Sequence, residues 1–155
     1  MRKYQLIFGL ALTALFFALT TTTLAAPGPF IMATKPINPN AVTMVYDPLT
    51  GMTTVNGADV TLTSFQVESA SSQFLADGVD AGFKVGPFDV ASAAKMFTLR
   101  TDGVTELTIG NVLAPGLGMD ALLADLTVDG SKAPSGTIAE ADGGGPYLFV
   151  PEPSS

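Results

Sequence analysis

The stretch Val60-Thr61-Leu62-Thr63-Ser64-Phe65-Gln66-Val67-Glu68 is the clearest β-strand signal in the chain. Apolar and polar residues alternate along it, which is typical of a strand with one buried face. The apolar set changes face between Leu62 and Phe65, and one extra residue near Thr63-Ser64 would account for the change. The sequence therefore predicts a bulged strand over residues 60–68.

Similar short segments on both sides of this strand predict a mainly β fold. Further strands are predicted at residues 42–46, 52–55, 97–100, 104–109, 127–128 and 147–150. Turn residues separate them, at Asp47–Gly51, Asn56-Gly57, Asp77-Gly78, Asp102-Gly103 and Asp129-Gly130. Asn56-Gly57 is the strongest short hairpin signal among these turns. Short strands between tight turns indicate a single β-sandwich, with its core over residues 41–130.

Two segments inside this pattern predict short helices. Val90, Ala93, Ala94 and Phe97 have helical spacing behind Asp89, which could cap a helix. Residues 119–126, with an aspartate near their start, predict one or two further turns. Residues 111–118 read as a loop. Residues 131–146 are rich in Gly, Pro and Ala and predict a mobile linker around their glycine triplet.

The N-terminal end resembles an export signal. A basic start, Arg2-Lys3, precedes an uncharged apolar run over residues 6–19, and small residues follow at Thr23, Ala25 and Ala26. We expect residues 1–25 to be a signal peptide that signal peptidase cuts between Ala25 and Ala26. An uncleaved membrane anchor is the competing interpretation, because the run approaches ~20 residues if the threonines are counted. Residues 26–40 predict a proline-rich extended arm.

The composition excludes several classes of function. The chain has 155 residues and a formal charge of −7, and two of its seven basic residues are Arg2 and Lys3. Nucleic acid is not an expected partner, because few cations remain to contact phosphates. The chain has no histidine and no cysteine. Histidine-based nucleophile pairs, a disulfide framework and an ordinary zinc site are therefore excluded.

Two patterns could carry chemistry, and a structural interpretation suits each better. Ser92-Ala93-Ala94-Lys95 matches the Ser-x-x-Lys pattern of penicillin-interacting serine enzymes, but their Ser-Asp-Asn and Lys-Thr-Gly elements are missing. A surface turn of a short helix accounts for it.

The second pattern is a loop with two carboxylates, Asp77 and Asp80, which could join Asp125, Asp129 and Asp142 in a calcium site. EF-hand spacing is absent, and plain Asp-Gly turns explain these residues. A glycosidase pair would need two converging acids, and nothing in the sequence singles out such a pair. We expect no catalytic residue, no cofactor and no metal.

The C-terminal end, Val150-Pro151-Glu152-Pro153-Ser154-Ser155, resembles the opening of the PEP-CTERM sorting signal of Gram-negative bacteria. In that family a Pro-Glu-Pro motif precedes an apolar transmembrane helix and a short arginine-rich end. An exosortase, a membrane-embedded enzyme associated with exopolysaccharide production, reads the signal. The resemblance assigns residues 147–155 to a last strand and a sorting motif. Two explanations stay open for the missing helix and basic end: a truncated gene product, or a tail that the given sequence leaves out.

Two internal stretches extend the resemblance. Residues 45–51 are similar to the Tyr-Asp-Pro-x-Thr-Gly start of PEP-CTERM proteins of planctomycete type, and residues 109–117 to their Gly-Asn-Val…Pro-x-Gly-Leu loop. The resemblance implies a cohesin-like or carbohydrate-module-like sandwich that is secreted or displayed on the surface. It implies no known reaction.

Residues and resemblance together predict an exported structural or adhesive protein of the cell surface or extracellular matrix, without catalysis of its own. Its expected partners are signal peptidase, an exosortase-type enzyme if the full tail exists, and exopolysaccharide. The alternative is a secreted ligand-binding module for carbohydrate or calcium. That alternative predicts a concave sheet face with exposed Tyr or Phe, or three or more converging acids. An enzyme is the third possibility.

Overall fold

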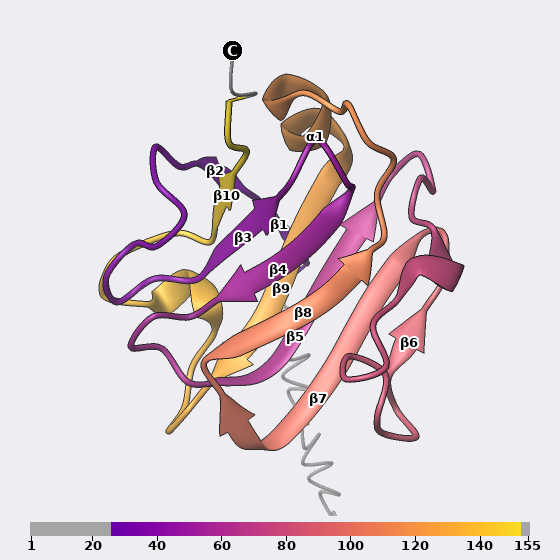
Figure 1. The fold of residues 1–155 in the computed structure, drawn as a ribbon. Coiled ribbons are helices and arrows are strands. Elements are labelled where there is room, and N and C mark those ends of the chain that lie inside the picture. Colours follow the sequence, from indigo (N-terminus) through magenta and orange to yellow (C-terminus); the bar gives the residue numbers. More distant parts are fainter. Residues whose placement is uncertain (1–25, 153–155) are drawn as a thin grey trace, which may run out of the picture.

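The computed structural model describes residues 26–152, which form two β-sheets stacked on one hydrophobic core (Figure 1). The predicted mainly β sandwich is confirmed. The predicted signal peptide, its cleavage residue Ala25, and Pro153 and Ser154 of the sorting motif lie outside the described residues. Ala26 is the first described residue, and it is exposed.

Each sheet has five strands. Sheet A is antiparallel and has the order β1 (Gly28–Pro29), β9 (Leu126–Lys132), β5 (Leu62–Ser69), β7 (Lys95–Val104) and β6 (Val90–Ala91). Sheet B has the order β2 (Ile31–Met32), β10 (Tyr147–Phe149), β3 (Thr43–Tyr46), β4 (Met52–Asn56) and β8 (Glu106–Asn111). Strand β10 lies between β2 and β3 and is parallel to both. Three short helices complete the described fold: α1 (Met119–Asp125), η1 (Ala76–Gly78) and η2 (Ile138–Glu140).

The bulge predicted in the best strand is confirmed. The register of β5 shifts between Leu62 and Ser64 against both of its neighbours, β7 and β9. The shift turns Leu62, Phe65 and Val67 to the same side, and all three are fully buried. An extra residue thus keeps the apolar set on the core face of the sheet.

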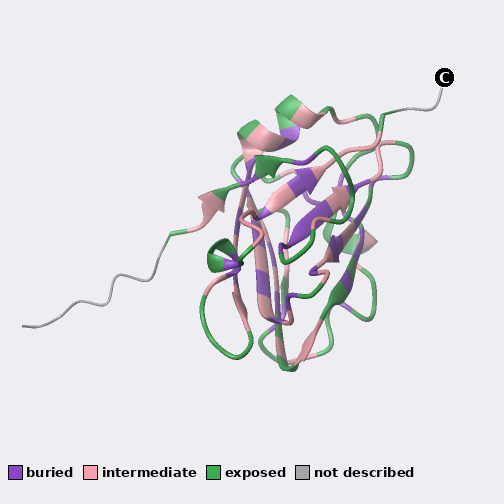
Figure 2. Cartoon of the chain, turned by 90° about the vertical axis from the view of Figure 1, so that its left-hand side faces the viewer, coloured by how far each residue is buried: buried purple, intermediate pink, exposed green. Residues whose placement is uncertain are grey.

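The core lies between the two sheets and draws residues from both. Phe65 and Met96 come from sheet A, Met44 and Ile109 come from sheet B, and α1 contributes Leu122. In Figure 2 the buried residues follow the strands, while exposed residues gather on the connecting loops. A fully buried side chain of this size contributes about 1.5–3 kcal/mol relative to leaving it exposed. The apolar alternation therefore stabilises the sandwich.

The helix predicted over residues 90–97 is wrong. The segment forms strand β6, a turn and the start of β7. Met96 and Thr98 point into the core, whereas Phe97 lies on the other face and is half-buried. Alternate residues therefore face alternate sides, as in any strand, and the helical spacing of the apolar residues is a coincidence.

The hairpin predicted at Asn56-Gly57 is also wrong, because the chain crosses there from sheet B to sheet A. The Asn56 side chain accepts the amide of Ala58 at 2.7 Å, and the Gly57 amide donates to Thr105 at 2.7 Å. A Cβ on Gly57 would lie 2.3 Å from the Val60 carbonyl oxygen. The turn thus bends toward the β7–β8 connection, and β4 pairs with β3 and β8.

Two further sequence predictions, a turn and a helix, are confirmed. The turn at Asp47–Gly51 joins β3 to β4, and Gly51 has the positive φ of +76° that the turn needs. The second predicted helix is present as α1. The predicted arm over residues 26–40 contributes one short strand to each sheet, β1 and β2.

The linker predicted over residues 131–146 is wrong. Ile138 in η2 is 1% exposed and belongs to the core. The Gly143 amide donates to the Asn40 carbonyl at 2.8 Å, and the Tyr147 hydroxyl donates to the Gly143 carbonyl at 3.1 Å. These contacts fasten the glycine-rich segment to the arm and to β10.

Candidate functional site

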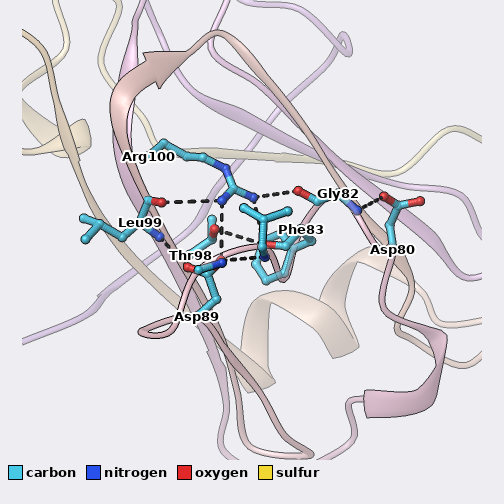
Figure 3. Close-up of polar contacts among 9 residues, drawn as sticks. Asp80, Gly82, Phe83, Asp89, Thr98, Leu99 and Arg100 are labelled. Atoms are coloured by element: carbon cyan, nitrogen blue, oxygen red, sulfur yellow. Dashed lines mark hydrogen bonds and ion pairs between the residues drawn. The ribbon is translucent and has the colours of Figure 1, made fainter.

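A buried ion pair fastens a long loop to sheet A. The loop runs over residues 79–89, and Arg100 on β7 reaches into it (Figure 3). One guanidinium nitrogen, Nη2, donates to the carbonyls of Gly82 and Phe83, each at 2.7 Å. The other, Nη1, lies 3.4 Å from Oδ2 of Asp89. The two side chains are 10% and 1% exposed, so solvent screens this pair little.

The Asp89 carboxylate also accepts three backbone amides. Oδ2 binds Val85 at 2.9 Å and Gly86 at 2.8 Å, and Oδ1 binds Leu99 at 2.9 Å. Burial acts to raise the pKa of Asp89, but these amides and the Thr98 hydroxyl outweigh burial and hold the pKa below its ordinary value. The carboxylate is therefore ionised at neutral pH and forms a fixed part of the loop.

The same pair completes the edge of sheet A. Strand β6 pairs with β7 at Phe97 and Met96 and then ends. One step further along β7, Asp89 accepts the Leu99 amide, and Arg100 Nη1 lies 3.4 Å from the Leu99 carbonyl oxygen. Two side chains thus take the place of a neighbouring strand. Occupied edge groups oppose pairing with a foreign strand.

An apolar surface lies beside this edge, on the outer side of sheet A. We call it the Phe88 face, and it surrounds a shallow hollow of about 600 Å³. It consists of Phe88, Val90, Phe97 and Leu99, with Gln66 and Lys95. Phe88 is 69% exposed, yet the next residue is the buried Asp89. The ion pair therefore holds the backbone directly next to an exposed aromatic residue.

At another part of the molecule, Tyr46 fastens the loop that precedes α1. Tyr46 is fully buried on β3, and its hydroxyl donates to the Ala114 carbonyl at 2.6 Å and accepts the Leu117 amide at 3.0 Å. The Gly116 amide donates to the Pro48 carbonyl at 2.8 Å. The two internal stretches that resemble the family, residues 45–51 and 109–117, thus contact each other directly.

Residues 150–152, the start of the predicted sorting motif, lie against the same two stretches. Together they line a half-open apolar groove of about 850 Å³, which we call the tail groove. Its lining residues are Met32, Ala33, Thr34, Pro48, Leu49, Gly116, Leu117, Gly118, Met119 and 149–152. Val150 packs on the core, whereas Met32 and Leu49 are 61% and 74% exposed. Four separate segments of the sequence, residues 32–34, 48–49, 116–119 and 149–152, therefore meet at one surface.

The Ser-x-x-Lys pattern forms no nucleophile pair. Ser92 Oγ accepts the Lys95 amide at 3.1 Å and donates to the Lys95 carbonyl at 3.2 Å, which closes the turn between β6 and β7. The Lys95 amine lies 3.3 Å from the Glu68 carboxylate and 5.8 Å from the centre of the Phe97 ring. The predicted surface turn is present, but it joins two strands and not a helix.

The acids considered for calcium serve local hydrogen bonds. Asp80 accepts the Gly82 amide and Asp129 accepts the Gly130 amide, both at 2.7 Å. Asp77 lies in η1, and Asp142 borders a small hollow near Lys132. Within residues 26–152, no group of three or more His, Cys, Asp or Glu could hold a metal ion.

Asp125 forms a second carboxylate cluster at the end of α1. It accepts the Ser69 hydroxyl at 2.5 Å, the Ser71 amide at 2.7 Å and the Gln73 side chain at 2.6 Å. Burial acts to raise the pKa of Asp125, and the hydrogen bonds from Ser69, Ser71 and Gln73 outweigh it, so the pKa lies below its ordinary value. This cluster fastens the segment after β5 to the end of the helix.

Sequence reasoning missed Arg100, which has four hydrogen-bond partners, as many as Asp89 has. Two of them are the carbonyls of Gly82 and Phe83, seventeen or more residues earlier, and such contacts leave no local pattern. One signal was present: only five basic residues lie beyond residue 25, and this one interrupts an apolar strand pattern after Leu99. An arginine placed there needs a partner.

Comparisons with protein-family models, curated proteins and solved structures found no match to this chain. None of the helices within residues 26–152 has the length and apolar character that crossing a membrane requires.

Proposed function

We propose that the chain is an exported structural or adhesive protein of the cell surface or extracellular matrix, of Gram-negative type, with no catalysis of its own. Signal peptidase would cut after Ala25. An exosortase-type enzyme would read the motif at residues 150–154, and exopolysaccharide is a candidate partner in the matrix. The folded domain would supply a contact surface.

The Phe88 face is the observation that carries this proposal. Aromatic side chains that are held rigidly at a surface dominate the energy of protein interfaces. Phe88 offers an exposed aromatic ring, and the Asp89–Arg100 pair holds the backbone next to it. The carboxylates of Asp89 and Asp125, in contrast, are engaged by groups of the chain itself. This arrangement favours a surface that binds a partner over a catalytic site.

Export is the first part to test. The full chain is produced in a Gram-negative host, and the N-terminus of the protein in each cell fraction is identified by mass spectrometry. We expect Ala26 at the N-terminus of exported protein, and an Ala25→Arg variant should stay uncut because the cleavage position needs a small residue. Recovery from the cytosol with Met1 still present would contradict the proposal.

Attachment is the second part to test. We expect a Phe88→Ser variant to leave the matrix fraction of producing cells, because truncating an interface anchor costs more than about 1 kcal/mol. Ile37→Ser is the matched control, since Ile37 is 53% exposed and lines neither the Phe88 face nor the tail groove. Equal retention of both variants in the matrix would argue against an adhesive role for this face.

A carbohydrate-binding module is the second candidate, and one observation favours it. Phe97 on the sheet and Phe88 in the preceding loop line one shallow hollow, and their rings offer apolar contact to a sugar ring. Calorimetric titration with neutral and acidic polysaccharides tests it, with Phe97→Ala as the variant. Calcium binding is tested separately by measuring the melting temperature with and without a chelator. An unchanged melting temperature would contradict a calcium-binding module.

A further inference from the structure

We propose that Asn56-Gly57 is a deamidation site, which the folded domain holds unreactive and which unfolding makes reactive. The sequence predicts a hairpin at this dipeptide, yet the dipeptide lies where the chain crosses from sheet B to sheet A. Deamidation is spontaneous and needs water alone. The modification is therefore independent of the proposed function.

Deamidation converts a side-chain amide to a carboxylate through a cyclic imide. The backbone nitrogen of the residue after the asparagine bonds to Cγ, and its proton leaves with the side-chain nitrogen as ammonia. Water then opens the ring at either of its carbonyls. The product is aspartate, or isoaspartate, in which the main chain runs through Cβ and Cγ. A following glycine favours ring closure, because it has no Cβ to obstruct the attacking nitrogen.

The sequence places this reaction on Asn56. The chain has four asparagines, and the residues that follow them are proline after Asn38, alanine after Asn40, glycine after Asn56 and valine after Asn111. Proline has no N–H to lose, and alanine and valine carry a Cβ beside the nitrogen. The other three asparagines are therefore internal controls.

The fold engages both groups that would react. The Gly57 amide donates to the Thr105 carbonyl at 2.7 Å, so its nitrogen is directed at the β7–β8 connection. The Asn56 side chain accepts the Ala58 amide at 2.7 Å and donates to the Glu106 carboxylate at 3.2 Å. Ring closure would require these partners to be released.

The backbone also opposes ring closure. Asn56 is the last residue of β4 and pairs with Glu106 of β8. The ring requires the Gly57 nitrogen to eclipse Cβ of Asn56, whereas the extended backbone of a strand turns that nitrogen away from Cβ. Gly57 is buried, and its carbonyl accepts the Val60 amide at 2.7 Å, which opposes the necessary rotation. The site can therefore react only when the end of β4 opens.

Neither product fits the place that the asparagine leaves. Isoaspartate lengthens the main chain by a methylene group, which displaces Gly57 from the Thr105 carbonyl. Aspartate keeps the main chain but sets a carboxylate opposite that of Glu106, and like charges directly opposite each other on neighbouring strands are destabilising. Refolding does not restore the lost ammonia. A chain that stays unfolded for long thus acquires a permanent defect at the β4–β8 pair.

The experiment compares deamidation in the folded and the unfolded chain. The full chain is incubated in mildly alkaline buffer with and without denaturing guanidinium chloride, and mass spectrometry with chromatography separates asparagine, aspartate and isoaspartate at each position. We expect Asn56 to convert in the unfolded chain and at least about tenfold more slowly in the folded chain, because the strand end must first open. Asn40 and Asn111 should convert far more slowly than Asn56 in the unfolded chain.

A Glu106→Ala variant tests the side-chain contact. It removes the acceptor of the Asn56 amide, so conversion in the folded chain should quicken about two- to tenfold, as loss of one hydrogen bond allows. The rate in guanidinium chloride should not change. Thr108→Ala is the matched control, since Thr108 is exposed on the same strand and pairs with Thr54. It should leave both rates unaltered.

A Glu106→Gln variant tests the effect of the product. In urea titrations it should stabilise an Asn56→Asp chain, because a glutamine amide can donate to the new carboxylate, and it should not stabilise the unaltered chain. Asn111→Asp is the matched control. It adds the same charge to an exposed position of β8 that pairs with Met52, and Glu106→Gln should therefore rescue it less.

Four results would overturn the proposal. Equal rates at Asn56 in the folded and the unfolded chain would show that the fold does not protect it, and no conversion in the unfolded chain would remove the site itself. Conversion of Asn40 or Asn111 as fast as that of Asn56 would show that the following glycine does not decide the reaction. An Asn56→Asp chain that gains nothing from Glu106→Gln would contradict the charge effect.

Discussion

Two loops are fastened to the sandwich in different ways. The 79–89 loop is held by a charged pair, Asp89 and Arg100, which together bind three amides and two loop carbonyls. The loop over residues 112–118 is held by one phenol, Tyr46, which donates once and accepts once. Both fasteners are buried. The Asp89–Arg100 pair binds more backbone groups than Tyr46 does. If one residue of the pair is removed, however, the other is left as an uncompensated buried charge.

Each of the two fasteners also positions one surface of the molecule. The charged pair positions the Phe88 face, while Tyr46 positions Leu117 in the wall of the tail groove. Breaking either fastener should therefore disturb one surface and leave the other intact. Two substitutions and a change of pH test this difference.

Replacing Arg100 by Met should have the largest effect, a loss of about 3–5 kcal/mol in the free energy of unfolding. The change leaves the Asp89 charge buried and removes the donors for Gly82 and Phe83. Urea titration followed by circular dichroism measures it. Lys95→Met on the same strand is the matched control, because its pair with Glu68 is over one-third exposed. That control should lose less than about 1 kcal/mol. If Arg100→Met and Lys95→Met lost similar free energies of unfolding, burial would not be what makes the Asp89–Arg100 pair the stronger of the two.

Replacing Tyr46 by Phe should cost about 1–3 kcal/mol, because the ring stays in the core and the buried backbone groups it bound lose their partner. The effect should be local: hydrogen exchange at the Leu117 amide should quicken, while exchange at the Leu99 amide should not. Tyr147→Phe is the control, since its hydroxyl makes one bond of 3.1 Å to Gly143 in a half-buried position. An unchanged Leu117 amide would show that the phenol does not hold the loop.

Mild acid should produce the smallest of the three losses of stability. Of the two fasteners, only the Asp89–Arg100 pair should respond to it. The pKa of Asp89 lies below its ordinary value in the folded chain, so the unfolded chain binds more protons in acid. The stabilisation is therefore complete above about pH 4 and is lost as the pH falls through the folded pKa. At about pH 3.5 only a part of the stabilisation by the ionised Asp89 carboxylate is lost.

Urea titrations at neutral pH and at about pH 3.5 measure this difference. An Asp89→Asn variant should lose less stability between the two values than the unaltered chain, because it has no carboxylate there to protonate. Asp125, whose pKa is also lowered, contributes equally to both proteins and cancels. The Tyr46→Phe variant should keep the full pH dependence. Equal pH dependence in the Asp89→Asn variant would contradict the linkage.

The sequence was sufficient wherever the local pattern and the tertiary environment agree. The bulge in β5 could be predicted because Leu62 and Phe65 both had to reach the core. The turn at Asp47–Gly51 carries its own hydrogen bonds, from Leu49 and Thr50 to Asp47, and needs nothing from elsewhere in the chain. Helix α1 was predicted from an aspartate, Asp120, near its start, and Asp120 lies in the first turn.

The spacing of apolar residues gave a wrong prediction, a helix over residues 90–97, where those apolar residues lie at the surface. Val90 and Phe97 pair across β6 and β7 and belong to the Phe88 face, so their helical spacing did not mark a buried side. Asp89 was interpreted as a helix cap because it precedes that spacing, yet its carboxylate binds loop amides and Leu99.

The candidate surfaces were out of reach of the sequence for the same reason. Resemblance singled out residues 45–51, 109–117 and the C-terminal end, but their meeting at the tail groove depends on the pairing of β10 with β3. Exposure of Phe88 depends on how the 79–89 loop folds back. Neither contact has a local signature.

The position of β10 between β2 and β3 has a mechanical consequence. The three strands are parallel, so the first and last parts of the described chain lie side by side and run in the same direction. A pull that separates the two ends of the described chain acts along these strands and across the slanted, evenly spaced hydrogen bonds between them. The bonds then bear the load together and do not open one by one. A protein tethered under flow would resist tension best with that geometry.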